Sequence, residues 1–235
     1  TEEQKQKYLT KLATGEIIGA FCLSEPEAGS DATSQRTTAE DKGDYYLLNG
    51  TKNWITNGSS ASVYLVMAQT DVEKGHKGIN CLIVEKGMEG FQIGPKENKL
   101  GIRGSDTHSL MFTDVKVPKE NRIGEDGFGF KFAMQTLSGG RIGIASQALG
   151  IASGAMELAV KYSKERKAFG KPISEHQAIA FKLADMATEI DAARFLCLHA
   201  AWLKYQGKKF DKEGAMSKLF ASKIAMDSTF EAVQI

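Results

Sequence analysis

The sequence contains few of the residues that stabilise secreted or metal-binding domains. It has three cysteines, Cys22, Cys81 and Cys197, which lie far apart and show no C-x-x-C spacing. An odd number of widely spaced cysteines argues against a disulfide framework and indicates free thiols in a reducing compartment. The four histidines form no pair at the spacing of a zinc site, so we expect no bound metal.

Neither sign of charge dominates. Thirty basic and 29 acidic side chains give a formal net charge of +1, and no basic tail or stripe is present. Composition therefore gives no electrostatic reason to expect nucleic acid or an anionic membrane as a partner. The apolar stretch 142–160 is interrupted by Gln147 and Glu157, so we expect a buried helix there and no membrane span.

Glycine-rich nucleotide motifs are missing as well. The glycines form neither a G-x-G-x-x-G unit between a strand and a helix nor a phosphate loop that ends in Gly-Lys-Ser/Thr. A nicotinamide or ATP site therefore lacks support.

The hydrophobic pattern divides the chain into two halves. With 42% hydrophobic residues in 235, there is enough apolar matter for one large or two ordinary domains. Residues 17–117 alternate with a period of two and are rich in β-branched and aromatic residues, which predicts an antiparallel β domain, a small barrel or a sandwich. Within this half, Asn49-Gly50 predicts a tight hairpin between 45–48 and 51–55.

The second half has a helical period. One helix is predicted over 128–166, a second after Ser174, which forms a capping box with Gln177, and a third from 211 to the end. The fold class is therefore α+β, with a β domain followed by an antiparallel helical bundle. Gly150 and Gly154 predict close packing against a neighbouring helix, and three helices alone leave an apolar stripe uncovered.

The most informative segment is the run Cys22-Leu23-Ser24-Glu25-Pro26-Glu27-Ala28-Gly29-Ser30-Asp31, between an apolar strand and a polar one. Its proline, glycine and short hydroxyl residues predict a tight loop with accessible amides and hydroxyls. Such a loop suits the polar edge of a ring or a phosphate group, although an ordinary turn has the same composition. Further along the chain come Trp54-Ile55-Thr56 and Glu165-Arg166-Lys167-Ala168-Phe169-Gly170.

These three segments, in this order, resemble the acyl-CoA dehydrogenase family. The resemblance covers nearly the whole chain and is greatest to the short-chain, butyryl-type branch. It implies an FAD held between the β domain and the helical bundle. The implied reaction is α,β-dehydrogenation of a short-chain acyl-CoA to a trans-2-enoyl-CoA, with electrons passed to electron-transfer flavoprotein, in a homotetramer.

The resemblance also implies cofactor-binding residues. Backbone amides and the Ser24 hydroxyl would meet the flavin pyrimidine edge, Trp54 would pack on the ring, and Thr56 would lie at N5. Arg166 would bind the pyrophosphate from an adjacent subunit, and Phe169 and Gln177 the adenosine part. The complete predicted set is Phe21, Cys22, Leu23, Ser24, Gly29, Ser30, Trp54, Ile55, Thr56, Arg166, Phe169, Gln177 and Gln234.

Two of these residues have simpler interpretations. Taken alone, Trp54 is a strand aromatic in a core. Arg166 taken alone is a cation at the C-terminal end of a helix.

For the thioester, the resemblance implies CoA contacts by Ser30 and by Ser138, Gly139, Gly140 and Arg141. Arg141 would pair with a CoA phosphate; a surface cation is its simpler interpretation. Many relatives carry Asp at position 138. Some carry the catalytic glutamate at position 140, which is glycine here, so we expect no catalytic residue in this chain and a base beyond residue 235.

The resemblance further predicts the domain limits. Residues 1–16 would be the tail of an N-terminal helical domain, 17–118 the β middle domain and 119–235 an incomplete helical bundle, so that the chain is a piece of a longer one. An acyl-CoA oxidase and a non-catalytic flavin-binding or assembly module are the alternative functions. Bacterial cytoplasm is the predicted location, and the mitochondrial matrix is the alternative.

Overall fold

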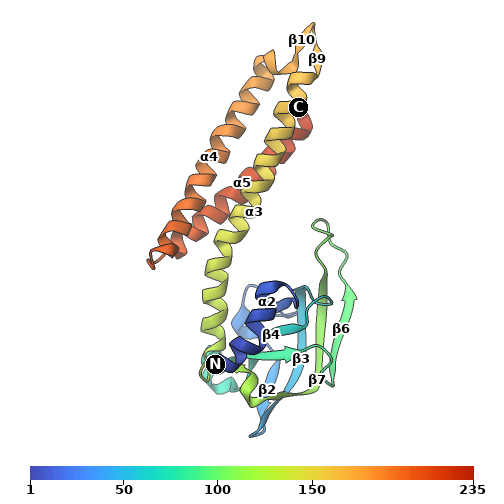
Figure 1. Ribbon diagram of the computed structural model, residues 1–235, viewed down its shortest axis with the longest axis vertical. Helices are drawn as coiled ribbons and strands as arrows, with labels where there is room; N and C mark the ends of the chain where they lie inside the picture. The colour runs from blue at the N-terminus through green and yellow to red at the C-terminus, as the bar shows by residue number, and fades with distance from the viewer. The chain divides into compact units, whose positions relative to one another are not determined.

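The computed structural model describes residues 1–235 and divides them into two compact units, Thr1–Met134 and Gln135–Ile235 (Figure 1). The first unit contains all the longer strands and the second consists mainly of helices. The division lies inside a long helix, whereas the sequence-based limit at 118/119 precedes that helix and stays a prediction.

The strands of the first unit form one mixed sheet in the order β6-β7-β3-β2-β4-β5-β8, with β1 paired to β4. The predicted α+β class is confirmed. Because β1 runs parallel to β4 and the edge strands β6 and β8 do not pair, the prediction of an antiparallel barrel or sandwich is corrected to an open, mixed sheet. The β1 and β4 strands are not joined by a hairpin, so the chain leaves their relative direction free. The strands are β1 Gly19–Cys22, β2 Thr38–Asp41, β3 Tyr45–Thr56, β4 Val63–Gln69, β5 Ile79–Glu85, β6 Phe91–Lys96, β7 Thr107–Pro118 and β8 Arg122–Ile123.

The largest of the apolar clusters in the first unit is formed by residues of several of these strands. Tyr46 and Leu48 of β3, Tyr64 and Val66 of β4 and Leu110 of β7 are buried in it. The members of each strand are two residues apart, as the alternating pattern predicts.

The hairpin predicted at Asn49-Gly50 is wrong. Both residues lie inside the continuous strand β3, at a shift in its register with β7. Asn49 bonds across the bulge to Asp114, with its Nδ2 donating to Oδ1 at 3.0 Å and its Oδ1 accepting from the Asp114 amide at 2.8 Å. Gly50, at φ +143°, lets Thr37 approach to a position that a Cβ would fill. The glycine therefore serves close packing and a bulge.

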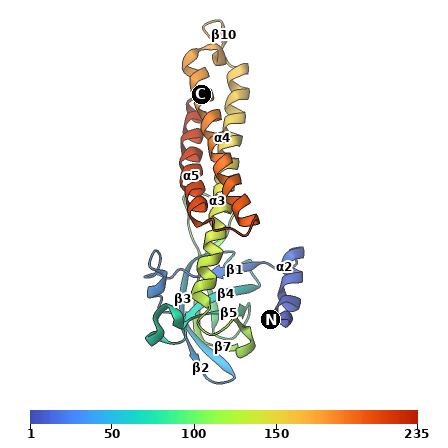
Figure 2. The same ribbon diagram turned by 90° about the vertical axis from the view of Figure 1, so that its left-hand side faces the viewer.

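The chain begins with a helical segment made of α1 (Glu2–Gln4), a π-helical turn (Lys5–Leu9) and α2 (Thr10–Thr14), visible beside the sheet in Figure 2. Tyr8 is buried against Val63 and Ile83, and its hydroxyl donates to Glu85 at 2.6 Å. This segment therefore packs on the β unit.

The second unit consists of most of α3 (Gly129–Glu165) together with α4 (Gln177–Tyr205) and α5 (Asp211–Gln234), close to the predicted limits. A short hairpin, β9 (Lys167–Ala168) with β10 (Lys171–Pro172), joins α3 to α4. Ala152, Met186, Ile190 and Ile224 form one of its cores.

Two details of the helical prediction are not found within this chain. Ser174 lies in a 3-10 turn, and His176 is the N-cap residue of α4 without a side-chain cap, so the capping box does not form. A Cβ added at Gly150 or Gly154 would meet nothing within 4 Å, so no helix of this chain packs closely there.

Large apolar side chains remain exposed along all three helices. Leu158, Phe195 and Leu219 are each more than 70% exposed. By length and composition alone α3 could cross a membrane, which is weak evidence for a span. Only 17% of its apolar window is buried, so the buried helix predicted over 142–160 is not found within this chain. The predicted uncovered stripe is therefore present within this chain.

Candidate functional site

A tightly closed loop follows strand β1. Glu25 and Ala28 exchange backbone hydrogen bonds of 3.0 and 3.2 Å, which closes a turn with Pro26 at its second position. Asp31 then accepts hydrogen bonds from the hydroxyls of the next turn, at 2.6 and 2.5 Å. Both ends of this segment, residues 23–31 and here called the Ser24 loop, are thus fixed by local bonds.

A buried ion pair fastens the Ser24 loop to strand β3. The Lys52 Nζ atom donates to the Leu23 carbonyl at 3.0 Å, to Glu25 Oε1 at 2.7 Å and to Gln35 Oε1 at 3.1 Å. The side chains of Lys52 and Glu25 are 0% and 4% exposed. Two backbone amides at positions 36 and 37 also donate to the Glu25 carboxylate. All three donors of the ammonium are therefore satisfied.

The ionised form of Glu25 is favoured in this setting. Burial opposes ionisation, but the Lys52 charge and the hydrogen bonds from Lys52 and the backbone outweigh burial and lower the Glu25 pKa. Removing only one partner of such a charged, fully hydrogen-bonded pair strongly destabilises the folded protein.

Strand β3 bulges directly after Lys52. Trp54 has a φ of +60°, and the register with β7 shifts between Lys52 and Ile55. Ile55 is 2% exposed, whereas Trp54 is 61% exposed, so the interpretation of Trp54 as a core aromatic is wrong. The Asn53 amide donates to the Ser24 carbonyl at 2.8 Å. The Ser24 loop and the bulge are therefore bonded to each other at two adjacent residues of β3.

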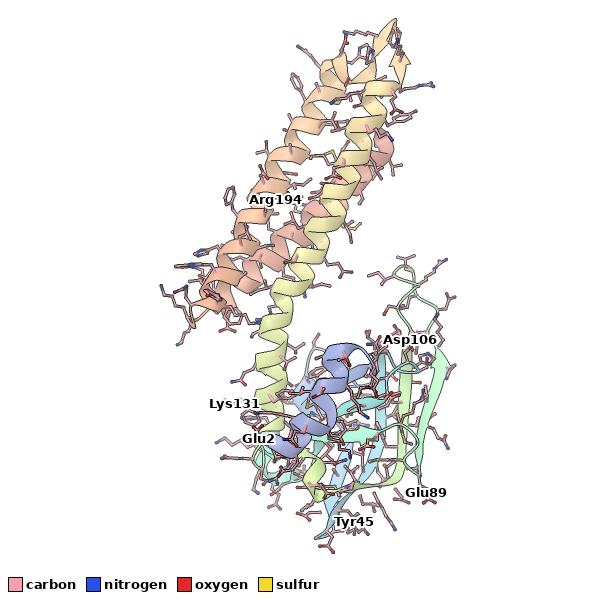
Figure 3. All side chains as sticks on the ribbon, in the orientation of Figure 1. Glu2, Tyr45, Glu89, Asp106, Lys131 and Arg194 are labelled. Carbon is pink, nitrogen blue, oxygen red and sulfur yellow. The ribbon has the colours of Figure 1, made fainter.

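A carboxylate holds the turn that follows Thr56. Asp106 lies at the entry to β7 (Figure 3). It accepts hydrogen bonds from the Ser59 amide at 2.9 Å, the Ser59 hydroxyl at 2.6 Å and the Ser60 amide at 3.1 Å. Burial acts in the opposite direction, but these hydrogen bonds lower the pKa of Asp106 to about 2. The segment from the bulge to this turn is consequently fixed at both ends.

Three hydroxyl groups in this region have no partner in the chain. Those of Ser24, Ser30 and Thr56 form no hydrogen bond, whereas neighbouring hydroxyls bind local carboxylates. The exposed Trp54 indole is carried by the same bonded segments, which therefore offer an aromatic face as well as polar groups. The donor set fits a planar ring that has a polar edge.

The second unit brings together three of the predicted residues at the junction of α3 and α4. Arg166 follows α3, and its carbonyl accepts a hydrogen bond from the Ile173 amide at 2.9 Å. Phe169, at the tip of the hairpin, is 95% exposed and has a φ of +51°. Its ring centroid lies 5.9 Å from that of His176, next to Gln177. The exposed Arg166, Phe169 and Gln177 are therefore neighbours; Gln234 lies at the end of α5 and is also exposed.

The predicted CoA-contacting residues Ser138, Gly139, Gly140 and Arg141 lie on α3, far from this junction. A Cβ on Gly139 would lie 3.0 Å from the Lys204 Nζ atom, near the end of α4. At 1.5 Å per residue, the 25 residues from Arg141 to Arg166 span about 37 Å. The two predicted groups therefore lie toward opposite ends of the helical unit.

Two family models match the chain. The acyl-CoA dehydrogenase middle domain matches residues 20–115, and the acyl-CoA dehydrogenase C-terminal domain matches residues 127–235. The chain belongs to the acyl-CoA dehydrogenase family. The two matches correspond to the sheet with its Ser24 loop and to the helices, which confirms the family inferred from the three motifs.

Individual family members agree with this assignment. The short-chain specific acyl-CoA dehydrogenase of Clostridium acetobutylicum is 53% identical over the whole chain, which covers 62% of that protein. The butyryl-CoA dehydrogenase structure from Megasphaera elsdenii is 54% identical with a TM-score of 0.97, and the chain covers 61% of it. A chain from the electron transferring flavoprotein structure of Acidaminococcus fermentans is 57% identical with a TM-score of 0.97, and 62% of it is covered.

The chain thus spans about 60% of the length of the curated relatives that it matches. Relatives at 52–54% identity include both bacterial and mammalian mitochondrial proteins, so identity favours neither compartment.

Sequence reasoning missed Lys52 and Asp106. A signal for Lys52 exists in the alternation of β3, because Tyr46 and Leu48 face the core and Lys52 has the same parity. A lysine at a core position requires a buried partner. Asp106 is distant in sequence from the turn that it holds, and no pattern marks it.

Proposed function

We propose that the protein is an FAD-dependent short-chain acyl-CoA dehydrogenase that converts a short acyl-CoA to its trans-2-enoyl-CoA. The observation that carries the proposal is the joined pair of motifs, in which the Ser24 loop and the Trp54 bulge are bonded to each other and leave three hydroxyls without partners. FAD, when bound, supplies the hydride acceptor.

In this scheme the residues of this chain bind the cofactor and orient its ring. The Ser24 hydroxyl and loop amides would hold the polar edge of the isoalloxazine ring, Trp54 would cover its face, and Thr56 would lie beside the accepting nitrogen. Hydrogen bonds at that edge favour negative charge and so assist hydride transfer to the ring. The apolar cover of Trp54 excludes water from the reacting atoms.

Removal of the α-proton needs a carboxylate base in this scheme. Glu25 does not serve, because its oxygens already bind Lys52 and two backbone amides. Gly140 has no side chain to offer. We therefore propose that the base is supplied from outside residues 1–235.

The spacing along α3 supports an oligomeric site. Arg141 and the Ser138 segment would contact CoA, whereas Arg166, Phe169 and Gln177, about 37 Å away along the helix, would bind the pyrophosphate and adenosine of FAD. We propose that these distant groups belong to different active sites of a homotetramer, with Arg166 binding the FAD of an adjacent subunit. The exposed apolar side chains of the helices would be covered there.

Electron-transfer flavoprotein is the proposed electron acceptor, in keeping with the related chain from the Acidaminococcus structure. The compartment, bacterial cytoplasm or mitochondrial matrix, stays a prediction.

Anaerobic titration of the intact, FAD-loaded protein with butyryl-CoA tests the function. We expect loss of the visible flavin absorption, followed by reoxidation that depends on electron-transfer flavoprotein. A colourless protein that FAD does not reconstitute contradicts the proposal, and prompt peroxide formation in air identifies an oxidase instead. Thr56→Val, which is isosteric and lacks the hydroxyl, is expected to slow bleaching, whereas Thr14→Val, in the N-terminal segment, is not.

A further inference from the structure

Lys52 is the one lysine of the chain that is fully withdrawn from solvent, and its three hydrogen bonds reach two positions of the Ser24 loop and one beyond it. It contacts the first residue of the Ser24 loop through the Leu23 carbonyl, the turn of the loop through Glu25, and the chain beyond the loop through Gln35. Its own strand continues into the Trp54 bulge two residues later. One ammonium group thus connects the two motifs.

A pair that only stabilises the fold would have a simpler arrangement. Replacing a buried pair by apolar residues of similar volume is often neutral or stabilising, so stability alone does not require it. Here the ammonium also binds a backbone carbonyl of the loop, which no apolar residue can do. The Asn53 amide donates to the Ser24 carbonyl at 2.8 Å, so this bond too forms only when the loop lies where Lys52 holds it.

We propose that Lys52 is a positioning residue for the cofactor: it fixes the Ser24 loop relative to the Trp54 bulge, so that the Ser24 and Thr56 hydroxyls meet the same ring. This inference rests on the proposed function. Lys52 touches neither cofactor nor substrate in this role and acts through Leu23 and Glu25. Its loss therefore affects flavin affinity and flavin environment beyond any effect on folding.

The test uses Lys52→Met, the double variant Lys52→Met with Glu25→Gln, and Asn121→Leu, all in the intact protein. Methionine is unbranched and fills the volume of the lysine stem. The double variant removes both buried charges but not the need of the Leu23 carbonyl for a donor. Asn121 is a matched control, because it is 6% exposed and binds the Ile83 carbonyl at 2.8 Å, on a strand remote in sequence from the loop.

Three quantities are measured: the thermal midpoint without FAD, the Kd for FAD by flavin fluorescence, and the visible spectrum of the bound flavin. We expect the double variant to be at least as stable as Lys52→Met, to bind FAD at least tenfold more weakly than the parent, and to show an altered flavin spectrum. Asn121→Leu should lower the midpoint and leave the Kd within twofold. If Lys52→Met does not fold, the double variant carries the test.

A double variant with a parental Kd and spectrum overturns the positioning role and leaves Lys52 as half of a stabilising pair. A parent that does not bind FAD overturns the proposed function instead. In that case hydrogen exchange at the Asn53 amide still decides the anchoring: faster exchange in the double variant than in the parent supports it, and equal exchange refutes it.

Discussion

Replacing Phe169 by asparagine is expected to stabilise the protein while weakening the binding of FAD. Phe169 and Gly170 form the two-residue turn between β9 and β10, with φ values of +51° and +79°. Two positive values are the mark of a type I′ turn, for which Asn-Gly is the preferred sequence. A bulky residue in this left-handed region costs about 1–2 kcal/mol, most of which asparagine avoids.

Little stability is lost with the aromatic ring. The Phe169 side chain is 95% exposed, so it buries on the order of 10 Å², worth about 0.3 kcal/mol. Its edge-on contact with His176 adds little at so exposed a position. Phe169→Asn should therefore raise the free energy of unfolding by about 0.5–1.5 kcal/mol, or the midpoint by about 1–6 °C for a chain of this size.

Differential scanning calorimetry without FAD measures the gain, and Phe169→Ala is the control. Alanine removes the same ring but lacks the short polar side chain by which asparagine stabilises the left-handed conformation, so its midpoint should stay at or slightly below that of the parent. An asparagine variant no more stable than the alanine variant would refute the strain argument. If both variants keep the parental Kd for FAD, the proposed contact of Phe169 with the cofactor is wrong.

Three further predictions concern single positions. Asp106→Asn should cost about 1.5–3 kcal/mol at pH 7, because charge-assisted bonds to the turn after β3 are lost. The folded pKa of Asp106 is about 2, below its ordinary value of 3.8, so the stabilisation is complete above pH 4 and is lost as the pH falls toward 2. Chemical unfolding measures this, and a difference in the free energy of unfolding between parent and variant that stays constant over this pH range would contradict the prediction. Gly140→Ala should stabilise α3 by about 0.5–1 kcal/mol, because the added Cβ meets open space. Gly129→Ala in the same helix would place a Cβ 2.3 Å from the backbone of strand β5 and should strongly destabilise the protein. Thermal midpoints of the two variants that move in the same direction would refute the distinction. Cys22 and Cys81 should resist thiol reagents in the native protein, since burial raises both pKa values, and rapid labelling of either would contradict their burial.

Local pattern was sufficient for most elements of the fold. The helical period predicted α3, α4 and α5 to within a residue or two, because each buries one face along its length. Prediction from the local sequence was wrong where a distant segment supplies the hydrogen-bond partner. Asn49-Gly50 has the composition of a hairpin turn, but its partner is Asp114, 65 positions away, and the strand continues through it.

The same distinction explains what was found and missed at the candidate site. The Ser24 loop and the Trp54 segment were predicted because their motifs are contiguous in sequence. Their connection by Lys52 was not predicted, because it depends on a strand bringing a core-facing lysine under a loop 27 residues earlier. Pairing between strands determines such contacts, and sequence spacing does not express it.

Backbone strain gives independent support to the motif assignment. Trp54 and Phe169 were selected by resemblance alone, yet both have bulky, largely exposed rings at positive φ. Neither burial nor turn geometry favours a large aromatic there, and folding stability alone would select glycine or asparagine. Strained and exposed residues persist where function uses them, so the cost at each position agrees with the proposal that each ring contacts a cofactor.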